Sequence, residues 1–414
     1  MVSTRAASSR GIGGAAAAVA LPAVLLLAAA RLGGCDTADS MTGEVDADAL
    51  PELTLVEEVR IGSLDDPDLG FSRISGVDVD EDGLTYVLES QEREIRVFDR
   101  DGRRVRTIGR QGSGPGEFGS PNRFGIIGDT VWVTDTRLSR LTLFTLEGDV
   151  LSTVESMGAV VDAPEGVTIR VRPNRMRRDR LFESGLSSMS YMVEPPGDIV
   201  VPRLLFDLKG NIVDTLSVDT IESAFSMLSD RITVGAITFI RPTPPTDAPR
   251  SLPTDDGTVR IERAHAPTRE SSTFAVTRTD TAGDTLYHRT FRYAPKPYAG
   301  AATDSLVGQH ARQYEERAGP DFEAVKAAIR DAYELPPYQS PVQSAQLGAD
   351  GSVWLLREDT GGDYTWILLA PDGSPRGQLA LPRRASIRWS SGDEAWIVVQ
   401  DEYDVQWLVR YRLR

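Results

Sequence analysis

Apolar and polar residues alternate in short runs from residue 53 onward, and glycine-containing turns separate many of these runs. The first clear set comprises four runs, over residues 76–80, 84–88, 94–98 and 104–108. Period-two alternation is typical of half-buried strands, and an Asp-Gly pair favours a tight hairpin because glycine adopts positive φ without strain. The pattern therefore predicts a unit of four consecutive antiparallel strands, lettered A to D.

This unit recurs along the chain, as repeat architectures require. We expect A–B turns at Asp82-Gly83, Gly128-Asp129, Glu165-Gly166, Asp256-Gly257, Asp350-Gly351 and Gly392-Asp393. We expect C–D turns at Asp101-Gly102, Glu147-Gly148, Lys209-Gly210, Ala282-Gly283 and Asp372-Gly373.

The sixth unit lacks a D strand after its C strand at residues 407–411, and residues 53–61 are the candidate to supply it. An N-terminal strand in that place would close a ring and remove two open sheet edges. The sequence thus predicts an all-β fold over residues 53–414: a six-bladed β-propeller closed by an N-terminal strand.

Three segments carry a family resemblance. Residues 74–87 resemble the opening of an NHL-type blade, and residues 98–102 and 112–118 resemble its close and the linker to the next blade. Overall the chain is similar to the bacterial six-bladed propeller lipoproteins, a group mostly without assigned activity. The resemblance implies a six-bladed propeller fold and a lipid-anchored location. It implies no activity, because these motifs are not catalytic.

The N-terminus has the form of an export signal. Arg5 and Arg10 precede an uncharged run over residues 11–30, and Leu32-Gly33-Gly34-Cys35 resembles a lipobox. We expect residues 1–34 to be a lipoprotein signal peptide, Cys35 to carry the lipid, and the acidic residues 35–52 to form a flexible tether. The protein would then be anchored to the inner or outer membrane, facing the periplasm or the exterior. An uncleaved transmembrane helix is the alternative.

Net charge and cysteine content narrow the function classes. The chain carries a formal charge of −16, with 61 acidic against 45 basic residues. Such a chain repels phosphate backbones, which argues against nucleic acid as its main partner. With one cysteine in 414 residues, neither an internal disulfide nor a cysteine-based metal site is expected.

Long segments interrupt the repeat, and the assignment places all of them in B–C loops or D–A links, at one end of the blades. They span residues 174–200, 217–230, 242–252 and 294–341, and the last has helical periodicity between blades 4 and 5. Loops on a rigid scaffold often carry binding residues, so this end is the functional candidate. The alternative is that insertions accumulate where they do least harm.

Six arginines between residues 170 and 180 stand out in this acidic chain. The assignment puts them at the end of a B strand and in the following loop. Arginine binds carboxylates and phosphates in a bidentate manner, so the cluster could take an anionic small molecule, a glycan or an acidic protein partner. The alternative is a loop neutralised by nearby acids. The candidate ligand-binding residues are Arg172, Arg175, Arg177, Arg178 and Arg180.

Other motifs favour structural roles. Residues 78–89 match a calcium-loop spacing, but a hairpin turn separates the two ends of that pattern, so no metal site is expected. Glu89 and Asp135 end B strands, where such acids hold neighbouring backbone amides. No catalytic or cofactor motif is present. The leading hypothesis is a membrane-tethered binding or scaffold propeller without catalysis; the alternative is a lactonase- or lyase-like enzyme acting at the central channel.

Overall fold

The computed structural model describes residues 44–414, apart from residues 65, 67–68, 156–157, 162–166, 192–198, 222–230, 236, 241–248, 264–271, 299 and 358–362. The expected signal peptide and Cys35 lie outside the described residues. Within the described part of the chain, no helix combines the length and apolarity needed to cross a bilayer.

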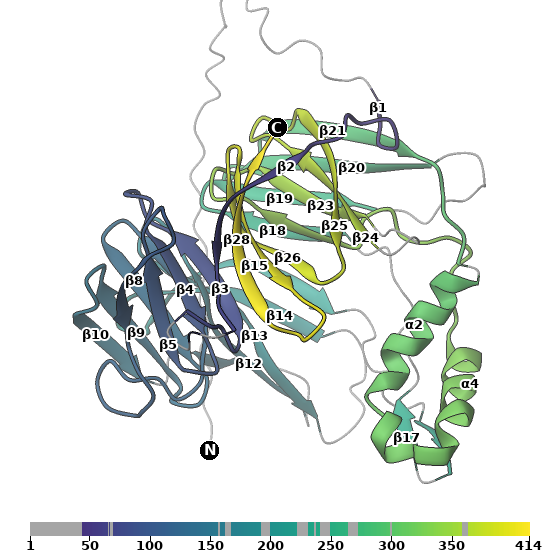
Figure 1. Cartoon of the computed structure of the whole chain (residues 1–414), viewed down its shortest axis with the longest axis horizontal. Coiled ribbons are helices and arrows are strands. Elements are labelled where there is room, and N and C mark those ends of the chain that lie inside the picture. Colours follow the sequence, from purple (N-terminus) through teal and green to yellow (C-terminus); the bar gives the residue numbers. More distant parts are fainter. Residues whose placement is uncertain are drawn as a thin grey trace, which may run out of the picture. The chain divides into compact units, whose positions relative to one another are not determined.

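Six antiparallel sheets, here called blades 1 to 6, make up most of the described chain (Figure 1). Blade 1 contains β3 (Ile74–Val79), β4 (Thr85–Glu89), β5 (Glu94–Phe98) and β6 (Arg104–Ile108). Blade 2 contains β7 (Pro121–Ile127), β8 (Thr130–Asp135), β9 (Arg140–Thr145) and β10 (Val150–Glu155). Blade 3 contains β12 (Val167–Met176), β13 (Phe182–Tyr191), β14 (Ile199–Phe206) and β15 (Ile212–Ile221).

The remaining blades follow the same A-to-D order. Blade 4 contains β18 (Arg250–Thr254), β19 (Gly257–Glu262), β20 (Ser272–Asp280) and β21 (Thr285–Tyr293). Blade 5 contains β22 (Ser344–Leu347), β23 (Val353–Arg357), β24 (Asp363–Leu369) and β25 (Pro375–Pro382). Blade 6 contains β26 (Ala385–Ser391), β27 (Glu394–Gln400) and β28 (Gln406–Leu413).

The D strand of blade 6 comes from the N-terminal part of the chain, as the sequence predicted. β2 (Leu55–Ile61) pairs antiparallel with β28, with Leu55 opposite Leu413 and Ile61 opposite Leu408. The pairing joins segments about 350 residues apart in sequence and leaves neither edge of β28 open. The all-β, six-bladed, N-terminally closed fold is therefore confirmed.

Apolar clusters fill five of the six seams between neighbouring blades. At the closing seam, Ile61, Trp396 and Leu408 of blade 6 pack with Ile74 and Val87 of blade 1, all of them buried. Comparable clusters join blades 1 and 2, 2 and 3, 4 and 5, and 5 and 6. Among the described residues, no such cluster spans the seam between blades 3 and 4. The contacts that the described residues make across that seam include ion pairs of Arg175 and Arg178 with Asp255.

The expected flexible tether is wrong for residues 44–52, which pack onto the propeller. β1 (Val45–Asp46) pairs in parallel with β21, and Ala47 and Leu50 are buried in the core between blades 4 and 5. Asp48 forms an ion pair of 2.6 Å with Arg357. The acidic composition indicates solvation, but two buried apolar side chains and two paired carboxylates, those of Asp46 with Arg292 and Asp48 with Arg357, dock the segment.

Ten of the eleven predicted blade turns lie among the described residues and are correct, whereas the eleventh, Glu165-Gly166 in blade 3, lies outside the described residues. An extra strand, β11 (Ala159–Val161), pairs beside β12. The A–B turn of blade 3 is instead Arg177–Arg180, which closes the β12–β13 hairpin. The arginine cluster thus belongs to an A strand and its turn. It does not lie in a B–C loop at the end of the blades that carries the insertions.

Two D–A links meet in one small insertion module. The link between blades 3 and 4 contains the hairpin β16 (Arg231–Val234) and β17 (Ile237–Ile240). The link between blades 4 and 5 contains α2 (Ala301–Arg312), α3 (Glu315–Ala318), η1 (Gly319–Asp321) and α4 (Phe322–Ala332). Buried side chains of the hairpin and the helices share one apolar core, and Figure 1 shows β17 at the end of the α2–α4 pair. The helical insertion between blades 4 and 5 is confirmed, and its partner is a hairpin from the preceding link.

Candidate functional site

Blade 3 divides the arginine run between two environments. Arg170 and Arg172 lie within β12, and Arg175 lies near its end. Arg177, Arg178 and Arg180 follow in the A–B turn, where the Arg177 amide donates to the Leu181 carbonyl at 2.9 Å. The two parts of the run therefore lie at different depths of the blade and have different neighbours.

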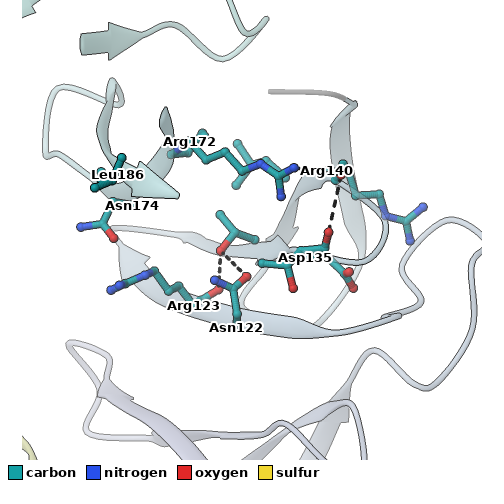
Figure 2. A pocket seen from close by; sticks show the side chains of 13 residues that line it. Asn122, Arg123, Asp135, Arg140, Arg172, Asn174 and Leu186 are labelled. Atoms are coloured by element: carbon teal, nitrogen blue, oxygen red, sulfur yellow. Dashed lines mark hydrogen bonds between the residues drawn. The ribbon is translucent and has the colours of Figure 1, made fainter. Parts of the chain in front are cut away.

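Arg172 lines a pocket of about 220 Å³ between blades 2 and 3, here called the interblade pocket. Figure 2 shows its side chain extending across the pocket above Asn122 and Asp135, with Asn174 and Leu186 at the other end. The Arg172 guanidinium has a weak contact of 3.4 Å with the Ser139 hydroxyl. The full lining is Asn122, Arg123, Thr134, Asp135, Thr136, Ser139, Arg140, Leu141, Arg172, Pro173, Asn174, Gly185 and Leu186.

The interblade pocket carries an excess of positive charge. Three arginines and one aspartate line it, and within the described residues neither Arg123 nor Arg172 forms an ion pair. Arg140 donates to the carbonyls of Ser113 and Gly114, which bear no formal charge. The lining therefore carries three positively charged guanidinium groups and one negatively charged carboxylate.

The Asp135 carboxylate in this pocket already has three amide partners. It accepts from the amides of Gly119 at 2.6 Å, Ser120 at 3.0 Å and Leu138 at 2.9 Å. Glu89 holds the Arg73 amide in the same way at 2.7 Å. Both acids act as the sequence predicted, by anchoring the segment that leads into each A strand.

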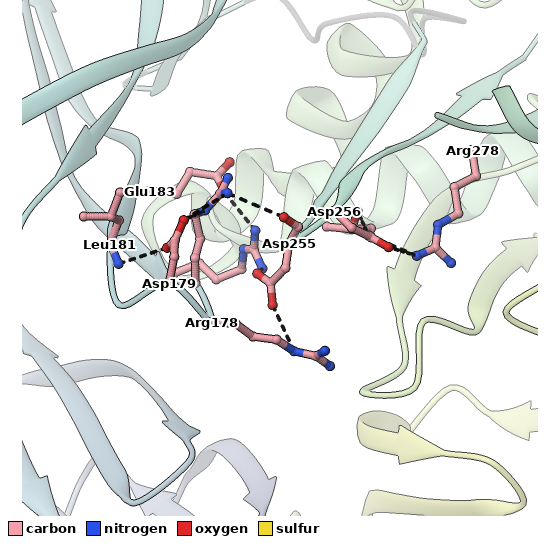
Figure 3. A network of polar contacts seen from close by, with 10 residues as sticks. Arg178, Asp179, Leu181, Glu183, Asp255, Asp256 and Arg278 are labelled. Atoms are coloured by element: carbon pink, nitrogen blue, oxygen red, sulfur yellow. Dashed lines mark hydrogen bonds and ion pairs between the residues drawn. The ribbon is translucent and has the colours of Figure 1, made fainter. Parts of the chain in front are cut away.

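The four arginines from Arg175 onward are paired with carboxylates, as Figure 3 shows for part of the network. Arg175 contacts Glu183 at 3.0 Å and Asp255 at 2.7 Å. Arg178 contacts the second oxygen of Asp255 at 3.4 Å. Because Asp255 lies in the A–B turn of blade 4, these pairs bridge the seam that lacks an apolar cluster among the described residues.

The last two pairs fix the turn itself. Arg177 contacts Asp179 at 3.2 Å, and Arg180 reaches Asp129 of blade 2 at 2.6 Å. Nearby acids thus neutralise the positive charge of the arginines from Arg175 onward. This is one of the two alternatives that the sequence leaves open. The prediction that these residues project from the insertion-bearing end is wrong, because the A strand had been assigned to the wrong segment.

A central channel opens at the end of the blades that carries the A–B turns. Its cavity has a volume of about 910 Å³, and all six blades contribute lining residues. Arg178 and Arg180 line it from blade 3, Asp78 from blade 1, and Arg388 and Trp389 from blade 6. Burial lowers the pKa of Arg388, and no described carboxylate pairs with it. Sequence reasoning missed Arg388 because it occupies an ordinary alternating position in a strand.

Asp78 ties blades together inside this channel. Its carboxylate accepts from the Ile126 amide of blade 2 at 2.8 Å and from the Val79 amide at 2.9 Å, and the Trp389 indole lies beside it. Burial is the largest effect on this carboxyl and raises its pKa to about 6. The calcium-like spacing around Asp78 is occupied by these contacts, and Glu89 lies at the other end of the β3–β4 hairpin.

A family model described as a 6-bladed beta-propeller matches residues 67–158. The chain is a six-bladed β-propeller. No curated protein matches its sequence. Similar solved structures include a Bacteroides fragilis protein inferred to be exported, at 10% identity and a TM-score of 0.46, covering 90% of this chain and 98% of that one.

Two further solved structures are similar at comparably low identity. A member of the duf4221 family from Bacteroides vulgatus is 11% identical with a TM-score of 0.45, and the alignment covers 88% of this chain and 99% of that one. Virginiamycin B lyase from Staphylococcus aureus is 12% identical with a TM-score of 0.38, covering 88% and 100%. At these identities the likeness extends to the propeller fold alone.

The paired arginines of this propeller generate a stability prediction. Asp255→Asn removes a carboxylate shared by Arg175 and Arg178 at the seam between blades 3 and 4, and should lower the free energy of unfolding by about 1–3 kcal/mol. Asp129→Asn is the matched control: its pair with Arg180 is exposed and should contribute less than about 1 kcal/mol. Urea denaturation measures both, and equal losses would contradict a special role for the seam.

Asp78 generates a pH prediction. Because its folded-state pKa of about 6 lies above the ordinary value of 3.8, the folded protein binds more protons between these values. Its contribution to stability is therefore most favourable at low pH and declines as the pH rises through 6. Relative to Asp78→Asn, the native chain should lose about 2 kcal/mol of unfolding free energy between pH 4.5 and 7.5. Identical pH dependence of the two proteins in urea titrations would show the idea to be wrong.

Proposed function

We propose that the protein is a lipid-anchored, extracytoplasmic binding propeller whose central channel takes a small molecule or glycan with an anionic group. The observation that carries this proposal is Arg388, which lines the channel without an ion pair to any described residue. The Arg388 side chain is exposed to the channel, where a guanidinium without a described carboxylate partner attracts an anion, because the walls of a cavity strengthen Coulomb attraction.

The surroundings of Arg388 suit a polar, charged ligand. Trp389 from the same strand offers an aromatic face, and the paired Arg178 is largely exposed at 81% of its side-chain area. The cavity volume of about 910 Å³ is in the range of small-molecule sites. Four arginines and four acidic residues line the cavity, so the positive charge that would attract an anion is local to Arg388.

Catalysis in the channel is the second candidate, and Asp78 is the observation that favours it. A channel carboxyl with a pKa of about 6 has the acidity that suits a general acid or base near neutral pH. Both of its oxygens, however, accept backbone hydrogen bonds, and the bond from Ile126 joins blades 1 and 2. The binding function therefore has the stronger support.

The channel proposal is tested by ligand-induced stabilisation. In a panel of uronic acids, sugar phosphates and inorganic phosphate, at least one compound should raise the melting temperature of the full chain. The shift should be clearly reduced in Arg388→Gln and fully retained in Arg384→Gln, whose exposed side chain pairs with Asp404 in the same blade. The absence of any stabilising compound, or an undiminished shift in Arg388→Gln, would contradict the proposal.

The anchoring proposal is tested at Cys35. Cys35→Ala removes the thiol that would carry the lipid, so the protein should move from the membrane fraction to the soluble fraction after export. Cell fractionation and metabolic labelling with palmitate measure this. If the Cys35→Ala protein is still membrane-bound, another segment anchors it.

A further inference from the structure

We propose that the interblade pocket between blades 2 and 3 is a second ligand site, separate from the channel, and that it binds a small ligand bearing a carboxylate or phosphate group. The combination that points to this site is a polar cavity of about 220 Å³ with Arg172 and Arg123 in its lining, neither of which is paired with a described carboxylate.

The contrast with the rest of the arginine run makes the pocket unusual. The four arginines from Arg175 to Arg180 all have carboxylate partners at 2.6–3.4 Å. Arg172 belongs to the same strand as Arg175, but among the described residues its side-chain partner is the distant hydroxyl of Ser139. Although the chain has 61 acidic residues, none of those described pairs with this partly buried guanidinium. Electrostatic attraction for a free anion is therefore retained there.

Nearby charges add to this attraction. Arg140 forms part of the pocket wall, and its hydrogen bonds go to uncharged carbonyls. The one aspartate in the lining, Asp135, has its oxygens directed to three backbone amides, so it does not pair with Arg172. A second hollow of about 260 Å³ shares Arg172 and Ser139 with the pocket and adds Arg170 to the cationic surface.

The lining also fixes the ligand class. Asn122, Asn174, Ser139 and Thr136 place amides and hydroxyls around the guanidinium groups, whereas Leu186 and Pro173 supply little apolar area. Arginine and amide donors match the oxygens of a carboxylate or phosphate, and the remaining hydroxyls and amides suit a polar ligand body. With room for about seven water molecules at ~30 Å³ each, the pocket fits a single sugar acid or a free phosphate rather than a polymer.

The pocket is built on rigid parts of the fold. Arg172 and Asn174 lie in β12, Arg123 lies in β7, and Asp135 ends β8. The seam beneath is apolar: the rings of Trp132 and Phe182 meet edge-to-face with centroids 5.8 Å apart. Side chains held by strands over a packed seam lose little freedom on binding, which favours affinity for a small ligand.

The test is isothermal titration of the full chain with two probes, sodium phosphate and sodium glucuronate, at constant ionic strength. We expect saturable binding of at least one probe, weakened at least tenfold by Arg172→Gln and several-fold by Arg123→Gln. Arg172→Lys should give an intermediate affinity, because it keeps the charge but loses the planar fork. Preference for one probe identifies whether a carboxylate or a phosphate is the natural group.

Two controls keep this site distinct from the channel. Arg260→Gln removes an exposed arginine that pairs with Glu262 in blade 4, and should leave the affinity unchanged. Arg388→Gln should abolish only binding at the channel. If Arg388→Gln loses all anion binding while Arg172→Gln and Arg123→Gln bind as the native chain does, the second site is overturned and the channel proposal stands. The second site is also overturned if neither probe binds saturably to the native chain. Since Arg123 is exposed, its variant should fold even if Arg172→Gln does not.

Discussion

Each sheet of this protein has two faces to cover, and the blades can cover them only by packing against one another in a closed cycle. The last link of that cycle is the pairing of β2 with β28, which brings Ile61 into the apolar cluster shared by blades 6 and 1. Without it, β28 would have a free edge and the closing seam would lose a buried side chain. The channel depends on this closure because all six blades wall it, whereas the interblade pocket depends on the packing of blades 2 and 3 alone.

At the seam between blades 3 and 4, the described residues cover the facing sheets with ion pairs instead of an apolar cluster. Where the other seams bury aliphatic and aromatic side chains, the described residues here place Arg175 between Glu183 and Asp255. A gap of about 310 Å³ beside it, bounded by β13, β14 and Pro253, is consistent with looser packing. Partly buried ion pairs contribute less than an apolar cluster of the same size, because desolvation offsets much of their attraction. The position of this seam coincides with the link that carries the β16–β17 insertion.

Local signals were strong enough to predict most of this fold. Turn glycines such as Gly83 and Gly102 adopt φ of 81° and 80°, a requirement that the sequence displays directly. The turn prediction for blade 3 failed because its A–B turn has no glycine. Arg180 adopts the left-handed conformation there, with φ of 62°. The sequence pattern therefore points to the nearest Glu-Gly pair, at residues 165–166, as the turn. One missing glycine shifted the strand assignment and moved the arginine cluster to the wrong end of the blade.

The sites were less predictable, because they depend on which side chains meet across blades. The density of arginines pointed to residues 170–180, but sequence spacing could not separate Arg172 from Arg175, which are three positions apart and have different surroundings. A bulge between Pro173 and Arg175 changes the register of β12 against β13 at this point. Beyond the bulge, Arg175 reaches Glu183 and the neighbouring blade; before it, Arg172 lies over the pocket shared with blade 2. A local irregularity in one strand thus separates the arginines that pair with the protein's own acids from Arg172, which has no described carboxylate partner.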